Sequence, residues 1–511
     1  MLENVTFDKN DLSVGIIEKQ GLQGTIITYS GVIIGFITAG YLLPKYLTQE
    51  QNGVLDVINA WSLIFATLAT LGINNVSNRL FPWFRNQKNH NNGYLGILFI
   101  VLFFGLLLST GLYLILRPYI LSNASETGAL LPRFIDLIIP LSVFTALFLV
   151  IDIYYAVLYK SVKGLLHKEL LQRIYILIAI GAYLVFAADF PLFVIMYIAA
   201  LSLPGLLILF SLMKDGEFVL HINRGILTKD LKINMFSVAA FGVAVSFSNI
   251  LIQKIDILMI QHYLGTVEVG TYGRVFFYGT LVVIPLRAIS KISAVVVAQA
   301  WKDKDLLLIK KVYTKSTVDQ LLIGSLVMIG LWANIDNVIH ILGSQYASGK
   351  YVVLFIGLSN LFLMAAGVSG AIISTSDFYK VLTIFVGVFG ALVILSNMIF
   401  IPALGITGAA LASAISALAY CIMRFGFLWS KYKMQPYSYK HLLILLAAMI
   451  SYAISLAVPD LYNPDNPTIS LILDILVRSG TIGISYLILI RLLGLSPDMN
   501  RWIKKFLNKS D

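Results

Sequence analysis

Apolar and polar stretches alternate about fourteen times along this chain. Each apolar stretch is about 20 residues long, which is the length that an α-helix needs to cross a hydrocarbon core of about 30 Å. The pattern predicts an all-α polytopic membrane protein with about 14 membrane-spanning helices. We expect these spans at residues 21–43, 54–75, 93–116, 134–158, 173–189, 191–213, 236–262, 271–290, 317–335, 351–375, 380–400, 404–429, 440–459 and 470–493.

The composition agrees with this prediction. The chain is 58% hydrophobic and 12% charged, and its mean hydropathy is +0.85, values far from those of soluble domains. Its first ~20 residues are polar and acidic, so we expect no cleavable signal peptide. The single cysteine, Cys421, has no second cysteine with which to form an intrachain disulfide.

The basic residues predict the orientation in the membrane. With the N-terminus in the cytoplasm, 30 of the 37 Lys and Arg fall in cytoplasmic segments, and only Lys45, Arg117, Arg133 and Lys350 fall on the opposite side. This asymmetry is the one that the positive-inside rule describes, so we expect both termini in the cytoplasm. Topology and contact with anionic lipids then account for the net charge of +11, and nucleic acid is not an expected partner.

Two cytoplasmic segments have an amphipathic pattern. The sequence AWKDKDLLLIKKVYTK, at 300–315, predicts a helix with one apolar and one basic face, and residues 497–508 predict another. Helices of this kind lie in the plane of the membrane interface. We expect both segments there, as surface anchors.

A repeated sequence pattern predicts two related lobes. Tyr46-Leu47 and Tyr263-Leu264 are each followed, seven positions after the tyrosine, by a glycine that opens the next helix, Gly53 or Gly270. Six helices separate the copies, so both run in the same direction across the membrane and form a parallel repeat. We expect a cytoplasmic tail at 1–20, an N-lobe of six helices at 21–213, a cytoplasmic linker at 214–235, a C-lobe of six helices at 236–433, helices 13 and 14 within 434–495, and a cytoplasmic amphipathic tail at 496–511.

Three segments carry a family resemblance. They are SNILIQKIDILMIQHYLGTVEVGTY at the junction of helices 7 and 8, IPALGITGAALASAISALAY at the junction of helices 11 and 12 and, more loosely, LGINNVSNRLFPWF at the end of helix 2. They resemble segments of the polysaccharide transporters, which belong to the multidrug/oligosaccharidyl-lipid/polysaccharide exporter (MOP) superfamily. The resemblance covers essentially the whole chain and fits a plan of six, six and two helices.

The resemblance implies a flippase of the bacterial cytoplasmic (inner) membrane. Such a protein moves a polyprenyl-diphosphate-linked oligosaccharide, an O-antigen or capsule repeat unit, from the inner to the outer leaflet by alternating access. The implied partners are this lipid-linked substrate, the membrane lipids, a coupling ion and a glycan polymerase. No cofactor is implied.

Charged groups inside membrane spans are functional candidates, because each costs ~2.5–3.5 kcal/mol on insertion scales. Arg274 in helix 8 is the leading candidate for binding the diphosphate, since related flippases resemble one another in carrying a cavity arginine. Its alternative is a structural pair with Asp256. Lys254 lies two residues before Asp256, about 200° away around the helix, so these two side chains need separate partners.

Three further arginines lie near the cytoplasmic ends of helices 2, 8 and 12. Arg79, Arg287 and Arg424 are candidates for collecting the diphosphate by fork-like hydrogen bonding. Snorkelling to the interface is the alternative, and for Arg424 it is the expected one. The related flippases carry an arginine in helix 1, whereas residues 21–43 of this chain carry no charge.

Asp474 and Arg478 are four residues apart on helix 14, and we expect them to form a structural pair. A groove for a lipid tail between helices 13 and 14 is the alternative for this region.

Transport is expected to draw on an ion gradient, because the chain contains no P-loop motif for ATP. Asp56, Asp152 and Asp256 are the carboxylates that would bind the coupling ion, H⁺ or Na⁺. The sequence leaves the choice of ion open.

Three other functions were weighed. A multidrug or cation antiporter of the same superfamily would have twelve spans, and helices 13 and 14 argue against it. An enzyme is not expected, because the outer loops are short and the six histidines are scattered without a metal-binding spacing. A flippase for another lipid-linked precursor, of peptidoglycan or teichuronic acid, remains open.

Overall fold

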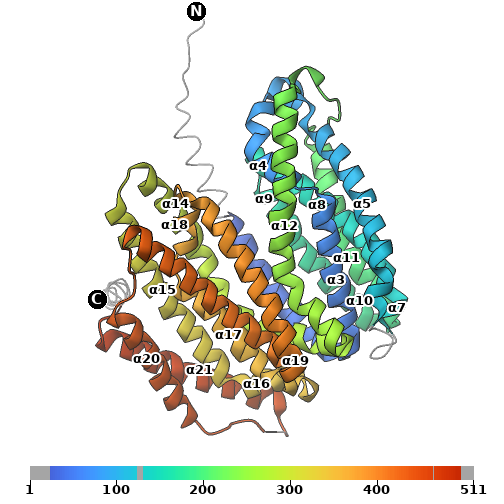
Figure 1. Cartoon of the computed structure of the whole chain (residues 1–511). Helices are drawn as coiled ribbons and strands as arrows, with labels where there is room; N and C mark the ends of the chain where they lie inside the picture. Colours follow the sequence, from blue (N-terminus) through green and yellow to red (C-terminus); the bar gives the residue numbers. More distant parts are fainter. Residues whose placement is uncertain (1–22, 123–129, 464, 496–511) are drawn as a thin grey trace, which may run out of the picture. The chain divides into compact units, whose positions relative to one another are not determined.

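The computed structural model describes residues 23–122, 130–463 and 465–495 (Figure 1). Eleven helices in this part of the chain are long and apolar enough to cross a membrane, and the predicted class of all-α polytopic membrane protein is confirmed. The predicted tails at 1–20 and 496–511 lie outside the described residues, as does the amphipathic helix expected in the second of them.

The chain divides into two compact units, Met1–Val269 (unit 1) and Gly270–Asp511 (unit 2). Unit 1 contains the helix Gln23–Tyr46, which includes η1 (Phe36–Leu42) and α2 (Leu43–Tyr46), then α3 (Gln49–Ala69), α4 (Ile73–Phe84), η2 (Gln87–Gly93), α5 (Tyr94–Ser122), α7 (Leu131–Phe134), η3 (Ile135–Leu137), α8 (Ile138–Val157), α9 (Val162–Leu165), η4 (Leu166–Leu171), α10 (Gln172–Val185), α11 (Phe190–Lys214), η5 (Arg224–Ile226) and α12 (Lys229–Leu264).

Unit 2 begins within α13 (Thr266–Thr280). It continues with η6 (Leu281–Val283), α14 (Ile284–Lys302), α15 (Leu306–Ala333), α16 (Ile335–Leu342), η7 (Ser344–Gly349), α17 (Lys350–Ala365), α18 (Ser369–Thr375), α19 (Tyr379–Tyr432), α20 (Tyr439–Leu456) and α21 (Pro467–Leu492).

The core of unit 1 lies around α8, which packs against α3 and α11. Fully buried aromatic side chains, among them Phe81, Tyr94 and Tyr154, fill the space between α4, α5 and α8. The rings of Phe81 and Tyr94 meet edge to face, with centroids 5.4 Å apart, an arrangement that aromatic pairs favour. Apolar contacts of this kind therefore hold α4, α5 and α8 of unit 1 together.

α12 belongs to unit 1 by its contacts. It packs against α3 and α4, where Trp61 Nε1 donates a hydrogen bond to Gln261 Oε1 at 3.3 Å and Asn75 Nδ2 donates to Gly242 O at 3.2 Å. The sequence analysis groups this helix with the second lobe, whereas the boundary between the two compact units falls after it, at Val269.

The eleven long helices account for twelve of the fourteen expected spans, because one of them contains two spans. The helix Lys380–Tyr432 is 53 residues long and contains two expected spans, joined at Gly405, whose φ of +61° interrupts the helical backbone three residues after Pro402. A left-handed φ costs a glycine little. Two more expected spans correspond to α10 and to the stretch α13 to α14, whose helices are shorter or more polar.

The two repeated hairpins have the same local form. Each glycine lies four residues after the start of its helix, at Gly53 in α3 and at Gly270 in α13, rather than opening it. The start of α3 is fixed by a capping box, in which Thr48 Oγ1 accepts from Gln51 N and Gln51 Oε1 accepts from Thr48 N. Such a box satisfies two backbone donors that a helix start leaves open.

The expectation of an interface-plane helix at 300–315 is wrong. α14 continues to Lys302, and after a short turn α15 begins at Leu306 and runs without interruption into the next span. Asp305 caps α15 by accepting from Leu308 N at 2.8 Å. The amphipathic sequence therefore forms the end of α14 and the first turns of α15, because the Asp305 cap starts a helix of 28 residues whose later turns are mostly apolar.

Candidate functional site

Three predicted residues of unit 1, Lys254, Asp56 and Asp152, lie in one chain of electrostatic neighbours with Lys168, a lysine that the sequence pattern did not single out. Lys254 on α12 lies within electrostatic range of Asp56 on α3, which attracts it, and of Lys168 in η4, which repels it. Lys168 in turn lies within electrostatic range of Asp152 on α8, which attracts it. All four side chains are partly buried. We call these four residues the internal charge cluster.

The internal charge cluster is built from four separate elements, which hold two cations and two carboxylates near one another. Lys168 also lies beside an aromatic ring, with its Nζ 5.4 Å from the centroid of Phe148. The backbone of α9 comes so close to Asp152 that a Cβ at Gly164 would overlap the carboxylate. Equal numbers of cations and carboxylates inside otherwise apolar helices leave the cations able to attract an external anion.

A second charged pair, missed by the sequence analysis, lies against helix 1. Arg173 on α10 and Glu169 in η4 form an ion pair, with Nη2 and Oε2 3.6 Å apart. A Cβ at Gly35 would overlap the guanidinium of Arg173, and a Cβ at Gly31 would overlap the backbone of Glu169. Residues 23–43 of helix 1 carry no charge, so α10 supplies the cation along this part of the helix. The signal in the sequence was the spacing of Gly31 and Gly35, since glycines four residues apart permit close helix approach.

Asp256 and Arg274 are both buried, in different units. Asp256 on α12 is 9% exposed and Arg274 on α13 is 5% exposed. Each is fixed on a helix that belongs to the repeated hairpin. Burial of this degree is unusual for charged side chains and requires that each be compensated locally.

The expectation that Arg424 snorkels to the interface is wrong. Arg424 on α19 is 8% exposed. Its Cζ lies 4.3 Å from the centroid of the Tyr420 ring, and its Nη2 donates to Cys421 Sγ at 3.4 Å. Contact with an aromatic ring and a polarisable sulfur stabilises a buried guanidinium, which then need not extend to the membrane interface. The side chain therefore stays inside unit 2.

The other two predicted arginines are less informative. Arg79 on α4 is exposed and lines a groove of about 470 Å³ together with Trp83 and Asp230. Arg287 lies in α14, and its side chain falls outside the described part of the chain. Neither is brought into the internal charge cluster by the contacts that the structure describes.

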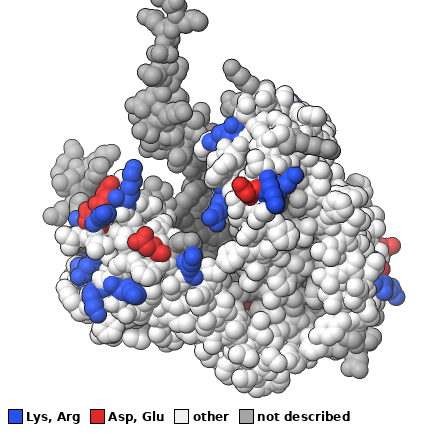
Figure 2. Space-filling model, turned by 45° about the horizontal axis from the view of Figure 1, so that its top comes forward, with Lys and Arg blue, Asp and Glu red and all other residues white. Residues whose placement is uncertain are grey.

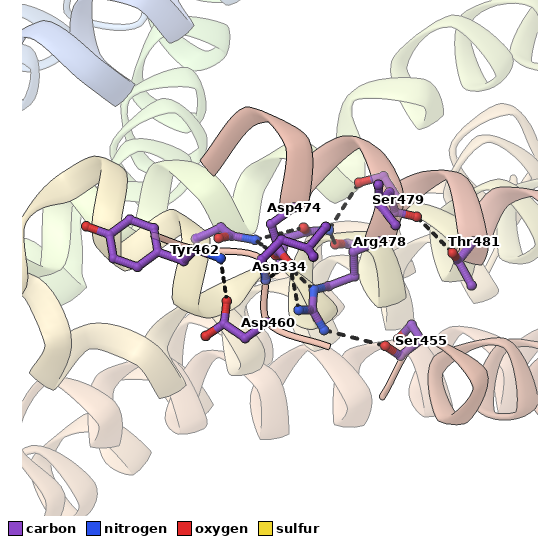
Figure 3. Close-up of polar contacts among 12 residues, drawn as sticks. Asn334, Ser455, Asp460, Tyr462, Asp474, Arg478, Ser479 and Thr481 are labelled. Atoms are coloured by element: carbon purple, nitrogen blue, oxygen red, sulfur yellow. Dashed lines mark hydrogen bonds and ion pairs between the residues drawn. The ribbon is translucent and has the colours of Figure 1, made fainter. Parts of the chain in front are cut away.

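The predicted pair of Asp474 and Arg478 is confirmed, within a larger polar network (Figure 3). Asp474 accepts from Arg478 Nη2 at 3.0 Å, from Leu461 N at 3.2 Å and from Asn337. Arg478 Nη1 donates to Ser455 O at 3.4 Å. These contacts join α16, α20 and α21 at one end of unit 2, where a fully bonded buried pair rigidifies the packing.

Among the described residues, no group of three or more His, Cys, Asp or Glu is placed to hold a metal ion. The chemistry that the arrangement offers is electrostatic: fixed cations and carboxylates inside otherwise apolar helices.

Comparison with solved structures relates this fold to transporters. A lipid II flippase, MurJ in an inward closed conformation, matches with a TM-score of 0.71 at 15% identity, over 92% of this chain and 99% of the flippase. A multidrug resistance MATE family transporter of the MOP superfamily, inward-facing, matches with a TM-score of 0.61 at 13% identity, over 80% of this chain and 94% of the transporter.

A MATE transporter in complex with MaL6 matches with a TM-score of 0.53 at 12% identity, over 81% of this chain and 96% of that one. No family model and no curated protein sequence matches the chain. At these identities the likeness shows the fold, so the chain has the fold of MOP-superfamily transporters.

Proposed function

We propose that this protein is a flippase for a polyprenyl-diphosphate-linked oligosaccharide, an O-antigen or capsule repeat unit. It would carry the unit from the inner to the outer leaflet of the bacterial cytoplasmic membrane by ion-coupled alternating access, with both termini in the cytoplasm. A glycan polymerase would receive the product. The proposal joins the sequence resemblance to polysaccharide transporters with the fold described above.

The observation that carries the proposal is the set of cations held inside spans. The cargo has a diphosphate that cannot enter hydrocarbon unaided and a lipid tail that need not leave it. Three cations are partly or fully buried: Lys254 on α12, Arg274 on α13 and Arg424 on α19. A charge inside a membrane domain costs free energy, so each of them is a functional candidate. Binding of a diphosphate to such cations would offset the free-energy cost of burying them.

The internal charge cluster suggests how cargo and ion are coupled. Lys254 lies within electrostatic range of Asp56, which attracts it. A cargo diphosphate that reaches Lys254 would replace Asp56 as the partner of the ammonium, because two anions cannot both neutralise one cation. The released Asp56, and Asp152 beside Lys168, would then take up H⁺ or Na⁺. Asp256 is the third candidate for this role.

A second candidate function is favoured by one observation. The similar structure that covers 92% of this chain is a lipid II flippase, so a peptidoglycan precursor, or another lipid-linked precursor such as one for teichuronic acid, is the alternative cargo. The MATE matches cover 80% and 81% of the chain. A multidrug antiporter therefore accounts for less of the molecule than a flippase does.

The test is to delete the gene in its host and extract the lipid-linked oligosaccharides. Complementing genes would encode the wild type, Lys254→Ala, Arg274→Ala and, as a matched control, Lys350→Ala. Lys350 is a lysine at the start of α17 that pairs with Asp336 at 2.7 Å. Membrane levels of all four proteins are measured in parallel.

Accumulation of completed oligosaccharide-diphosphate lipid in the deletion strain, relieved by wild type and Lys350→Ala but not by the other two variants, is the expected result. The accumulated glycan would also identify the cargo and so distinguish an O-antigen unit from a peptidoglycan precursor. Unchanged lipid-linked sugars, together with greater sensitivity to toxic cations, would replace the flippase proposal by the antiporter.

A further inference from the structure

A groove of about 620 Å³ lies in unit 2, between the first turns of α15 and the start of α20. We propose that it binds the headgroup of an anionic phospholipid. The ligand would place its phosphate among lysines and its acyl chains along the apolar flank of α15. This inference concerns unit 2 alone and holds whatever cargo the protein carries.

The groove combines positive charge with apolar surface. Four lysines line it, Lys310, Lys311, Lys315 and Lys440, against one carboxylate, that of Asp319. Leu307, at its edge, is 81% exposed, and Leu306 and Leu308 beside it are 46% and 37% exposed. Exposed leucines next to lysines are unfavourable in water, but they suit a lipid surface, which offers acyl chains and anionic phosphate side by side.

The length of α15 places the end of the groove that Leu307, Lys310 and Lys311 line at headgroup depth. α15 has 28 residues, so it is ~42 Å long at 1.5 Å per residue. The hydrocarbon core is ~30 Å thick, and about 20 residues from Ala333 reach across it. The first two turns, which carry Lys310 and Lys311, are then left in the headgroup layer. Figure 2, which brings this end of the helices forward, shows Lys and Arg gathered on that face in greater number than Asp and Glu.

The excess of lysines in the groove favours an anionic lipid over the C-terminal segment of the chain as its ligand. The segment 496–511 directly follows Leu495 in the sequence, and Leu495 lines the groove, so this segment is the other occupant to consider. It contains Arg501, Lys504, Lys505 and Lys509 against Asp498 and Asp511, and a net positive segment is repelled by a groove with a lysine excess. An anionic lipid is attracted to the same groove, by about a fivefold gain in affinity per lysine near the surface.

The test uses full-length protein in detergent. Binding of fluorescent phosphatidylglycerol and of fluorescent phosphatidylcholine is measured by anisotropy, and retained lipid is counted by native mass spectrometry. The groove variant is Lys310→Gln/Lys311→Gln/Lys440→Gln. Its matched control is Lys302→Gln/Lys380→Gln/Lys433→Gln, which removes three exposed lysines of the same unit outside the groove. A third variant replaces the groove lysines by arginine.

We expect phosphatidylglycerol to bind in preference to phosphatidylcholine. The groove variant should weaken phosphatidylglycerol binding by roughly a hundredfold, the control should stay within about twofold, and the arginine variant should keep its affinity. Equal binding by the groove variant and wild type would overturn the proposal. So would displacement of the lipid by millimolar inorganic phosphate, which would indicate a site for free phosphate, or a carbodiimide crosslink from Lys310 to Asp498, which would place the chain's own segment in the groove.

Discussion

The guanidinium of Arg424 lies over the ring of Tyr420, with Cζ 4.3 Å from the ring centroid. Within the described residues no carboxylate lies within ion-pair distance of this arginine. A desolvated cation–π contact contributes about 2 kcal/mol, whereas burying an unpaired guanidinium costs several kcal/mol. Arg424 is therefore held inside unit 2 at a net cost to stability.

Replacing Arg424 by methionine should lower the transport rate without lowering the stability of the fold. Arg424→Met removes the buried charge and keeps most of the side-chain volume, so we expect an unchanged or higher unfolding temperature in detergent. Transport of the lipid-linked substrate should fall at least about tenfold, since a charge-assisted contact with the diphosphate contributes about 1.5–3 kcal/mol. Both are measured on one preparation. A large fall in unfolding temperature would show instead that Arg424 has a structural role.

Replacing Gly31, Gly35 or Gly181 by alanine should change the stability of unit 1 by different amounts. A Cβ at Gly31 would meet the backbone of Glu169, which cannot move without shifting a helix, whereas a Cβ at Gly35 would meet the flexible end of Arg173. Gly31→Ala should therefore destabilise unit 1 by about 1–3 kcal/mol, and Gly35→Ala by less. Gly181 on α10 has no neighbouring heavy atom within 4 Å of such a Cβ.

Gly181→Ala serves as the control for this series, because it should stabilise its helix by up to about 1 kcal/mol. Thermal unfolding of the three variants gives the ranking. If Gly31→Ala and Gly181→Ala behaved alike, helix 1 would not pack against α10 as described.

The stability of the polar network around Asp474 should depend on the presence of both charged partners, Asp474 and Arg478. The Asp474 side chain is 2% exposed and that of Arg478 is 13% exposed. Arg478→Ala leaves the carboxylate buried with only Asn337 and a backbone donor, and should cost about 3–5 kcal/mol. Asp474→Ala/Arg478→Ala, which removes both charges, should recover part of this loss.

The exposed pair of Asp336 and Lys350 is the comparison for this network. Its side chains are 78% and 35% exposed, and Asp336→Ala should change the free energy of unfolding by about 0–1 kcal/mol. Urea or thermal unfolding measures all of these variants. Equal effects of Arg478→Ala and Asp336→Ala would contradict a buried network.

Asp215, at the end of α11, should make the stability of unit 1 depend on acid pH. Burial would raise the pKa of this carboxyl, but hydrogen bonds from Lys163 and Tyr155 outweigh burial and hold the pKa below its ordinary value. A group whose pKa is lower in the folded state stabilises the fold above its unfolded pKa, which is 3.8, and this contribution is lost as pH falls through the folded value.

Asp215→Asn should accordingly lower the unfolding temperature at pH 7, and the difference from wild type should shrink as the pH falls below 3.8 toward pH 3. Unfolding temperatures of wild type and variant between these pH values provide the measurement. A difference that stayed constant over this range would exclude the carboxylate as its cause.

The sequence predicted the spans well because membrane insertion is encoded by local apolar length, which needs no knowledge of contacts. The same reasoning predicted the pair of Asp474 and Arg478, whose members are neighbours on one helix. It could not predict that Lys254 lies within electrostatic range of Asp56, since that requires the packing of α12 against α3.

Arg424 and the segment at 300–315 show two other limits. Snorkelling was the expected behaviour of an arginine near a span end, and the nearby ring of Tyr420 and thiol of Cys421 changed the outcome. An amphipathic pattern fits a helix in the interface plane and the protruding end of a long span equally well. Only the cap at Asp305, with the apolar run behind it, distinguishes them.

Under the proposed function, Lys254 of the internal charge cluster binds the diphosphate of a lipid-linked oligosaccharide while the protein moves it across the membrane. The most direct measurement is transbilayer movement of a fluorescent polyprenyl-diphosphate oligosaccharide in proteoliposomes, followed by quenching from outside, with wild type, Lys254→Ala and Lys350→Ala. We predict rapid movement with wild type and Lys350→Ala, and a rate at least about tenfold lower with Lys254→Ala. A wild-type rate equal to that of empty liposomes, or a Lys254→Ala rate equal to wild type, would contradict the account.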